Sequence, residues 1–298
     1  MFINFILGIL LLNPLNVYFS DKLFFNIATD DAAIVPQRIN EENVGVIVTA
    51  KRFAAIDLNS GRLLLQKDIN VSQPIASITK LMTALVILDQ NPAWNKTVEM
   101  KEADETYGAA PHIYRGEELK FSDVWKTALI SSDNNAIKAM IRSMGFDEPE
   151  FVELMNAKAE ELGMYNTKFA DPTGLHEENV STALDVSRLL HAAMQENEIS
   201  ESVLTPKHSF EILNNGKTRN ISNTDILLDS FLNKKSYGYE LIGGKTGFIN
   251  EAGYCLAVEI SRDDNPVVIV VLNSATIDDR FQDVKAIADW VYSNYSWE

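Results

Sequence analysis

The chain has 298 residues, of which 46% are apolar, so its length and composition suit one large globular catalytic domain. Its formal net charge is −16 at pH 7, and its sequence pI is about 4.7. Lys and Arg form no run that could follow a phosphate backbone, so the composition excludes nucleic acid as an expected partner. The acidity itself indicates a well-solvated surface.

An apolar, nearly uncharged segment occupies residues 1–19 and is followed by an acidic, loop-like stretch over residues 20–43. We expect a signal peptide or membrane anchor, then a linker, then a catalytic domain over residues 44–298. No Lys or Arg precedes the apolar run and Pro14 interrupts it, so cleavage and anchoring both remain open, with a buried core helix as a third interpretation. Either of the first two places the rest of the chain outside the cytoplasm, in the periplasm or at the cell surface.

Strand patterns come next along the chain. Residues 44–49 are apolar and β-branched, which predicts a strand. Residues 53–58 and 62–66 flank the turn-forming sequence at 59–61, which predicts a β-hairpin.

Ser77 opens a strongly apolar stretch that predicts a buried helix with the serine in its first turn. The positive end of the helix dipole would favour the charge that develops when this hydroxyl attacks a carbonyl. Lys80 lies three residues further on, so its amine returns to the same helical face. Burial among apolar neighbours would lower its pKa and allow it to act as a base.

The middle of the chain predicts an all-helical insertion at about residues 100–200. Apolar side chains recur at helical spacing over residues 122–144, 150–162 and 182–195. Gly145, Gly163 and Asn197 stand where we expect helices to end, and residues 171–174 predict a turn.

Ser132, Asp133 and Asn134 interrupt the first of these helices with short polar side chains. Such residues compete with the helical backbone for hydrogen bonds, so the pattern predicts a local break that turns the side chains into a cleft. Ser132 would relay protons, and Asn134 would hold Lys80 and a substrate amide. A plain loop between two helices is the alternative for this motif by itself.

Three strands and a helix close the chain. Residues 241–247, 253–261 and 267–272 are strand candidates, and residues 279–292 carry apolar side chains at helical spacing. Neither terminal set of strands closes a core alone, so we expect an α+β fold. Its centre would be a five-stranded, mainly antiparallel sheet flanked by helices.

Lys245, Thr246 and Gly247 end the first of these three strands. Glycine lets a second backbone approach, as a peptide substrate pairing with the strand requires. Lys245 would bring positive charge, and the Thr246 hydroxyl could bind a carboxylate. The N–H of Phe248, together with that of Ser77, is the candidate oxyanion hole.

Cysteine and histidine offer no further chemistry. Cys255 is the only cysteine and lies in an apolar run, so we interpret it as a core strand residue that forms no internal disulfide. The four histidines are far apart and fit no metal-ligand spacing, so we expect neither a metal nor a cofactor.

The three motifs occur once each and in a fixed order, and S-x-x-K, S-D-N and K-T-G in that order form the active-site set of penicillin-binding proteins and class A β-lactamases. Over residues 44–292 the chain resembles the D-alanyl-D-alanine carboxypeptidases, the low-molecular-mass penicillin-binding proteins. Further runs that carry the resemblance are residues 74–84, 162–164, 166–167, 171–175, 181–185 and 252–254.

The resemblance implies a β-lactamase/transpeptidase-like fold and acyl-enzyme chemistry on peptidoglycan stem peptides, with covalent capture of β-lactam antibiotics. Arg280 and Phe281 look like the family's Arg-Phe pair, whose arginine helps to hold the terminal carboxylate of the substrate. Two departures stand out: no C-terminal β-rich domain with an anchor helix is expected, and Ile249 stands where the family commonly has threonine.

The sequence leaves several activities open. A D,D-carboxypeptidase is the main hypothesis, and a D,D-endopeptidase cutting peptide cross-links would use the same residues. A class A β-lactamase would need a carboxylate for deacylation, and no E-x-x-L-N run is present, while Glu177 and Glu178 are poor substitutes. An inactive penicillin sensor or peptidoglycan-binding module is the alternative that is not an enzyme.

Overall fold

The computed structural model describes residues 34–106 and 111–298. The expected signal or anchor segment and most of the expected linker therefore lie outside the described residues. Within the described ranges, every helix is too short or too polar to cross a membrane.

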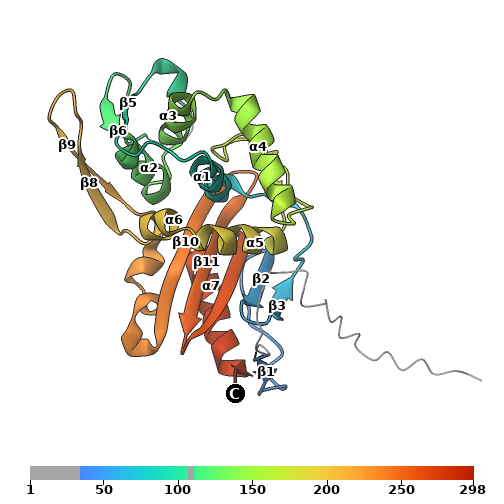
Figure 1. The fold of residues 1–298 in the computed structure, drawn as a ribbon. Coiled ribbons are helices and arrows are strands. Elements are labelled where there is room, and N and C mark those ends of the chain that lie inside the picture. Colours follow the sequence, from blue (N-terminus) through green and yellow to red (C-terminus); the bar gives the residue numbers. More distant parts are fainter. Residues whose placement is uncertain (1–33, 107–110) are drawn as a thin grey trace, which may run out of the picture.

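A five-stranded sheet forms the centre of the fold, and all its neighbouring strands are antiparallel (Figure 1). Its order is β10-β11-β12-β2-β3. The strands are β2 (Arg52–Asp57), β3 (Leu63–Lys67), β10 (Tyr239–Ile249), β11 (Gly253–Arg262) and β12 (Asn265–Ser274). The predicted hairpin, the three C-terminal strands and the sheet itself are confirmed. Because β10 is at one edge, one side of its backbone is unpaired in this sheet.

The sheet is covered on both faces, because alternate residues of each strand enter different apolar clusters. On β2, Phe53 and Ala55 pack with α7 (Asp279–Asn294), whereas Ala54 and Ile56 pack with the helical part of the molecule. Figure 1 shows α5 (Ala183–Met194) crossing one face of the sheet, while α7 runs along the other. The last predicted helix is thus confirmed, two residues longer at its C-terminal end.

Residues 44–49 do not form the predicted strand. Val44 is 88% exposed and Ile47 is 99% exposed, whereas Val46 and Val48 are half-buried and pack on the apolar cluster that contains α7. β2 already has β12 on one side and β3 on the other, which leaves no place beside it for another strand. Apolar β-branched residues form a strand only when their backbone also pairs with another strand, and residues 44–49 make no such pairing in the structure.

The two ends of the described chain are joined outside the main sheet. Residues 37–38 of the expected linker form β1 (Gln37–Arg38), which pairs with β13 (Tyr295–Ser296). The buried carboxylate of Asp283 accepts hydrogen bonds from the N–H groups of Thr49 (2.8 Å) and Ala50 (2.9 Å). It also accepts one from the Ser274 hydroxyl at 2.7 Å, so α7, the end of β12 and the approach to β2 are held together.

The region between β3 and β10 is mainly helical, but the insertion at about residues 100–200 that was expected to be all-helical also contains short strands. Its α-helices are α1 (Thr79–Asp89), α2 (Phe121–Ile130), α3 (Asn134–Met144), α4 (Glu148–Glu161), α5 and α6 (Asn197–Val203). Two-stranded pairs interrupt them: β4 (Gln73–Pro74) with β7 (Val180–Ser181), β5 (Thr97–Glu99) with β6 (Glu118–Lys120), and β8 (Lys207–Glu211) with β9 (Thr218–Ser222). The strands β4 to β7 have only two or three residues, too few to leave a periodic signal in the sequence, whereas the five-residue strands β8 and β9 lie beyond the predicted insertion.

The expected helix ends are correct in two of three places. Gly145 ends α3 with a left-handed φ of 98°, and Gly163 follows α4 with a φ of 70°. Asn197 instead begins α6, because the chain turns at Gln195 and Glu196 and enters another helix directly.

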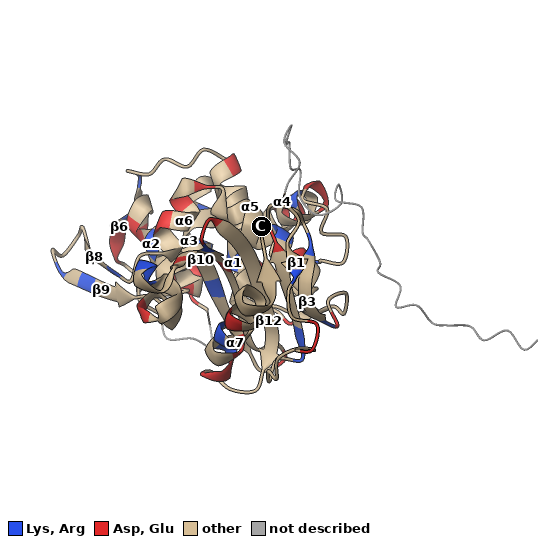
Figure 2. Ribbon diagram, turned by 90° about the horizontal axis from the view of Figure 1, so that it is seen from below, with Lys and Arg blue, Asp and Glu red and all other residues tan. Residues whose placement is uncertain are grey.

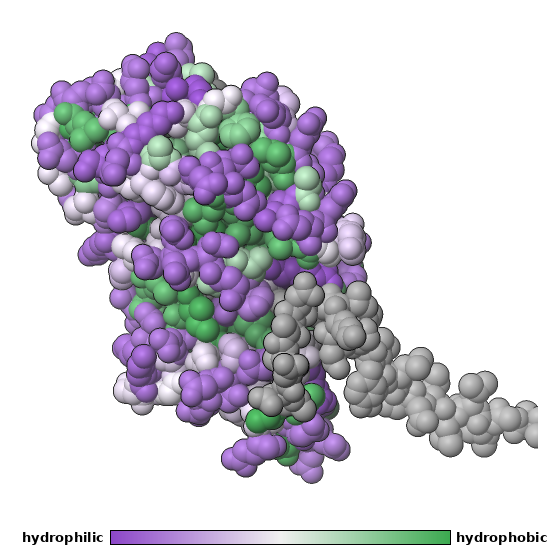
Figure 3. Space-filling model, viewed as in Figure 1, coloured by the Kyte–Doolittle hydropathy of each residue, from purple (hydrophilic) through white to green (hydrophobic). Residues whose placement is uncertain are grey.

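Charged residues are spread over the helices and loops, whereas the long strands of the sheet are largely uncharged (Figure 2). The face in Figure 3 is mostly hydrophilic, with smaller apolar areas between the polar side chains. The surface therefore agrees with the expectation that the net charge of −16 serves solvation.

Candidate active site

Ser77 lies in η1 (Ala76–Ile78), a short 3-10 turn that leads directly into α1. The predicted helix and the place of the serine at its start are confirmed. Ser77 is half-buried, whereas Ala76 and Ile78 on either side of it are buried. Its hydroxyl can thus reach a substrate while its neighbours fix the backbone in the core.

Two glycines contact this turn, one from the loop at residues 171–174 and one from β10. A Cβ on Gly174 would lie 2.1 Å from the carbonyl oxygen of Ala76, and one on Gly247 would lie 2.7 Å from that of Ile75. Ala76 itself has a φ of 50°, a conformation that costs an alanine energy and persists only where packing enforces it. The close approach therefore holds the turn that carries Ser77 against β10 and against the loop at residues 171–174.

Lys80 is fully buried on α1, and its amine points back to the serine as the spacing predicted. Its Nζ donates hydrogen bonds to Ser77 Oγ (2.9 Å), Asn134 Oδ1 (2.6 Å) and the carbonyl oxygen of Thr173 (2.6 Å). Burial lowers the pKa of Lys80 from 10.5 to about 7, and the nearby carboxylates of Asp171 and Asp133 oppose this shift. A substantial fraction of neutral amine therefore exists near neutral pH.

The break predicted at Ser132, Asp133 and Asn134 is present between α2 and α3. Ser132 has a left-handed φ of 61°, which turns its hydroxyl out of the helical path. Asp133 caps α3 by accepting a hydrogen bond from the N–H of Ala136 at 2.9 Å. The interruption thus has a local cause, and it brings Asn134 to Lys80.

Lys245 connects the third motif to the second. Its buried Nζ donates to Ser132 Oγ at 2.9 Å and to the carbonyl oxygen of Thr246 at 3.2 Å. Burial and the positive charges of Lys80 and Arg280 lower the pKa of Lys245, and the carboxylate of Asp225 opposes the shift. The two lysines thus lie on either side of the Ser132–Asn134 segment.

These residues surround a cavity of about 430 Å³. The residues that line it are Ser77, Ser131, Ser132, Asn134, Leu175, Thr224, Thr246, Gly247, Phe248, Ile249, Asn250, Glu251 and Arg280. The structure therefore brings together the nine residues predicted from the sequence, with Lys80 and Lys245 directly behind the surface of the cavity. Glu177 and Glu178, the two carboxylates weighed for deacylation in a class A β-lactamase, do not line this cavity. Glu178 instead pairs with Lys168 at 2.9 Å.

Arg280 reaches the cavity from the start of α7. It is only 6% exposed, and its Nη1 donates to the carbonyl oxygen of Gly247 at 3.3 Å. Its Nε is buried and has no hydrogen-bond partner in the structure. A buried guanidinium with a free donor can bind an incoming carboxylate.

The sequence did not assign a role to Asp171, Thr173 or Thr224. The Asp171 carboxylate accepts hydrogen bonds from the N–H groups of Thr173 (2.5 Å), Gly174 (2.7 Å) and His176 (2.5 Å). This places the Thr173 carbonyl on Lys80, and Thr224 Oγ1 lies 2.7 Å from Thr246 Oγ1. An aspartate that starts an Asp-Pro-Thr-Gly turn was the available signal, since such side chains often bind their own loop backbone.

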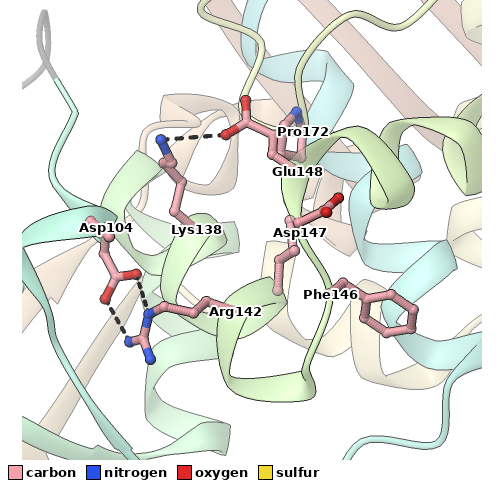
Figure 4. Close-up of a pocket in the computed structure, with 9 residues that line it drawn as sticks. Asp104, Lys138, Arg142, Phe146, Asp147, Glu148 and Pro172 are labelled. Carbon is pink, nitrogen blue, oxygen red and sulfur yellow. Dashed lines mark hydrogen bonds and ion pairs between the residues drawn. The ribbon is translucent and has the colours of Figure 1, made fainter.

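A second, smaller pocket of about 290 Å³ lies between α3 and the start of α4 (Figure 4). Four of the five charged side chains that line it form ion pairs: Arg142 binds Asp104 through two hydrogen bonds of 2.7 Å, and Lys138 lies 3.4 Å from Glu148. None of the residues that line it is a serine, threonine or cysteine. It therefore offers no hydroxyl or thiol nucleophile, and the cavity at Ser77 is the candidate active site.

Comparisons with known proteins agree on one family. A family model described as D-alanyl-D-alanine carboxypeptidase matches residues 38–276. The D-alanyl-D-alanine endopeptidase of Pseudomonas aeruginosa is 35% identical over 237 residues, which are 79% of this chain and 74% of that protein. The D-alanyl-D-alanine carboxypeptidase DacF of Bacillus subtilis is 30% identical over 252 residues, 83% of this chain and 63% of that protein.

A similar solved structure is that of the Streptomyces K15 DD-transpeptidase. It superimposes with a TM-score of 0.75 at 26% sequence identity, covering 83% of this chain and 98% of that one. The fold expected from the sequence is thereby confirmed.

Proposed function

The chain belongs to the D-alanyl-D-alanine carboxypeptidase family of serine peptidases, and on that premise we propose the role of each residue in its site. Ser77 is the nucleophile and Lys80 is its general base. The observation that carries this assignment is the 2.9 Å hydrogen bond from the Lys80 amine to Ser77 Oγ, together with a Lys80 pKa of about 7.

In the first half of the reaction, Ser77 Oγ attacks the carbonyl carbon between the two D-alanines and passes its proton to neutral Lys80. The N–H groups of Ser77 and Phe248 stabilise the oxyanion that forms. The C–N bond then breaks, and the departing amine of D-alanine receives a proton through the Ser132 hydroxyl. The product is an ester between Ser77 and the shortened peptide. In the second half, water attacks that ester and restores the serine.

The remaining residues hold the substrate. Thr246 and Arg280 bind its terminal carboxylate, with Lys245 supplying positive charge from behind. Asn134 orients Lys80 and a substrate amide. Gly247 lets β10 lie close to Ser77, so that a peptide can pair with the free edge of the strand.

The substrates are peptidoglycan stem peptides, and β-lactam antibiotics acylate the same serine. D,D-endopeptidase activity on peptide cross-links is a second candidate, supported by the 35% identity with the endopeptidase of Pseudomonas aeruginosa. Digestion of purified cross-linked and uncross-linked muropeptides in parallel separates the two activities. The enzyme works outside the cytoplasm, and the apolar segment at residues 1–19 exports or anchors it.

The decisive test is the intact mass of the protein after incubation with benzylpenicillin, followed by digestion to locate the adduct. We expect one adduct on Ser77 that persists for many minutes, and none in Ser77→Ala. We also expect Ser77→Ala to release no D-alanine from a pentapeptide. Unchanged release by this variant would overturn the assignment of the nucleophile, and rapid turnover of penicillin by the wild-type protein would indicate a β-lactamase.

A further inference from the structure

One end of the active-site cavity carries a carboxylate that the proposed reaction does not use. Glu251 lies in the exposed turn between β10 and β11 and lines the cavity together with Phe248 and Ile249. It is the one acidic side chain among the described residues that line this cavity. A negative charge here opposes a substrate that is recognised by its own carboxylate, unless a positive group of the substrate lies beside it.

The direction of the substrate follows from the proposed reaction, on which this inference rests. The terminal carboxylate lies at Thr246 and Arg280, and the attacked carbonyl lies at Ser77 and Phe248. Residues that precede the two D-alanines must therefore run along β10 beyond Phe248, towards the turn with Glu251. The free edge of β10 supplies the backbone partners for such an antiparallel segment.

Apolar surface lies beside the carboxylate. Phe248 is 46% exposed, and its ring stacks on Tyr254 with 4.4 Å between the ring centres. Leu175, which is half-buried, lines the same cavity from the loop that follows Thr173. A side chain with several methylene groups and a terminal ammonium matches this combination, because it can cover the apolar surface and reach the charge.

We propose that Glu251 is a specificity-determining residue that binds a side-chain ammonium on the residue preceding the two D-alanines. The methylene groups of that residue pack on Phe248 and Leu175. The enzyme thereby prefers stem peptides with a free side-chain amine at this position over peptides in which the amine is absent or acylated.

Two peptides that differ only in whether the side-chain amine is free or acetylated test the proposal: Nα-acetyl-L-lysyl-D-alanyl-D-alanine and its Nα,Nε-diacetyl counterpart. We expect kcat/KM of the wild-type enzyme to favour the free amine by about twofold to fivefold, the range of a partly exposed ion pair. In Glu251→Gln the ratio falls to about one, and in Glu251→Lys it inverts. Glu153→Gln, on the exposed face of α4, is the matched control and keeps the wild-type ratio.

Binding to Ser77→Ala, measured by calorimetry, gives the same ratio without turnover. If the wild-type enzyme released no D-alanine from either peptide, the proposed function would be contradicted, whereas the binding ratio would still decide the role of Glu251. A preference that survives in Glu251→Gln, or equal binding of the two peptides to Ser77→Ala, overturns the inference.

Discussion

Lys80 is completely buried, yet in the proposed reaction it must carry a proton for part of the cycle. Removing an ammonium from water disfavours its charged form, which is why burial dominates the shift of its pKa to about 7. Its three hydrogen-bond acceptors, on Ser77, Asn134 and Thr173, still stabilise the ammonium when it forms. The residue can therefore accept the proton of Ser77 and give it up again at little cost.

The rate of acylation by benzylpenicillin should accordingly rise with pH through about 7, because Lys80 is protonated below this pKa and neutral above it. The rate should fall again where Lys245, whose pKa burial also lowers well below its usual value, loses the charge that attracts the carboxylate. Stopped-flow measurement of the acylation rate across the pH range tests both the rise on the acidic side and the later fall. Lys80→Arg should be inactive, since a guanidinium stays protonated. A rate that did not change with pH around neutrality would contradict the role of Lys80.

At the residue scale, the identity of the candidate functional side chains could largely be predicted from the sequence, because each motif itself contains the residues that carry these groups. The Thr173 carbonyl that binds Lys80 was not, since every residue has a backbone carbonyl and its position depends on the fold. The same limit applies to Gly174 and Gly247, whose contacts with residues 75–77 exist only in three dimensions.

At the scale of elements, the contact between β10 and the η1 turn brings together the segments that carry the two N–H groups of the proposed oxyanion hole. In Gly247→Ala the new Cβ would lie 2.7 Å from the Ile75 carbonyl oxygen and 3.3 Å from Ser77 N, so the strand must move away. We expect acylation to slow by about 100-fold or more, comparable to the loss of one oxyanion donor, in a protein that still folds. Glu240→Ala, at an exposed position of the same strand, is the control and should keep the wild-type rate. Acylation at the wild-type rate in Gly247→Ala would show that the close approach is dispensable.

The loop at residues 171–174 is the second element that fixes the site. Asp171→Asn removes a negative charge near Lys80 and presents an N–H₂ group where the carboxylate accepted backbone hydrogen bonds. The pKa of Lys80 should fall, so the acid limb of the acylation profile should move to lower pH. Stability should decrease by about 1–3 kcal/mol.

Asp147→Asn is the control for this loop, since Asp147 also accepts a backbone N–H, at the start of α4, but near the second pocket (Figure 4). Its acylation profile should match the wild type. If Asp171→Asn unfolded like the wild type and its acylation rate rose over the same acidic pH range, the loop at residues 171–174 would have no role in setting the pKa of Lys80.

Helices, strands and breaks were predicted correctly where the local sequence pattern agrees with the packing and pairing in the fold. The break at Ser132–Asn134 was predictable because short polar side chains compete with a helix, and Asp133 does cap α3. The strand predicted at residues 44–49 was wrong because the backbone of this segment pairs with no other strand, and an apolar β-branched pattern alone does not determine pairing.

At the scale of the whole molecule, the sheet separates two apolar clusters with different tasks. One holds α1, α5 and the helices around the cavity, and the other holds α7 and the opposite face of the sheet. The sequence indicated that strands from both chain ends form one sheet, since neither set could bury its apolar face alone. Only the structure shows which face of the sheet carries the cavity and which carries α7, because this depends on which residues of each strand point to which side.

Ile287 tests this separation, because it is fully buried in the α7 cluster, across the sheet from Ser77. Ile287→Ala should lower the free energy of unfolding by about 2–5 kcal/mol, since it removes buried methyl groups and leaves a cavity. Urea unfolding followed by circular dichroism measures this, with the exposed Gln282→Ala on the same helix expected within about 0.5 kcal/mol of the wild type. Benzylpenicillin should still acylate the folded variant at the wild-type rate. Slower acylation in a fully folded protein would mean that α7 positions the site through Arg280 as well as stabilising the sheet.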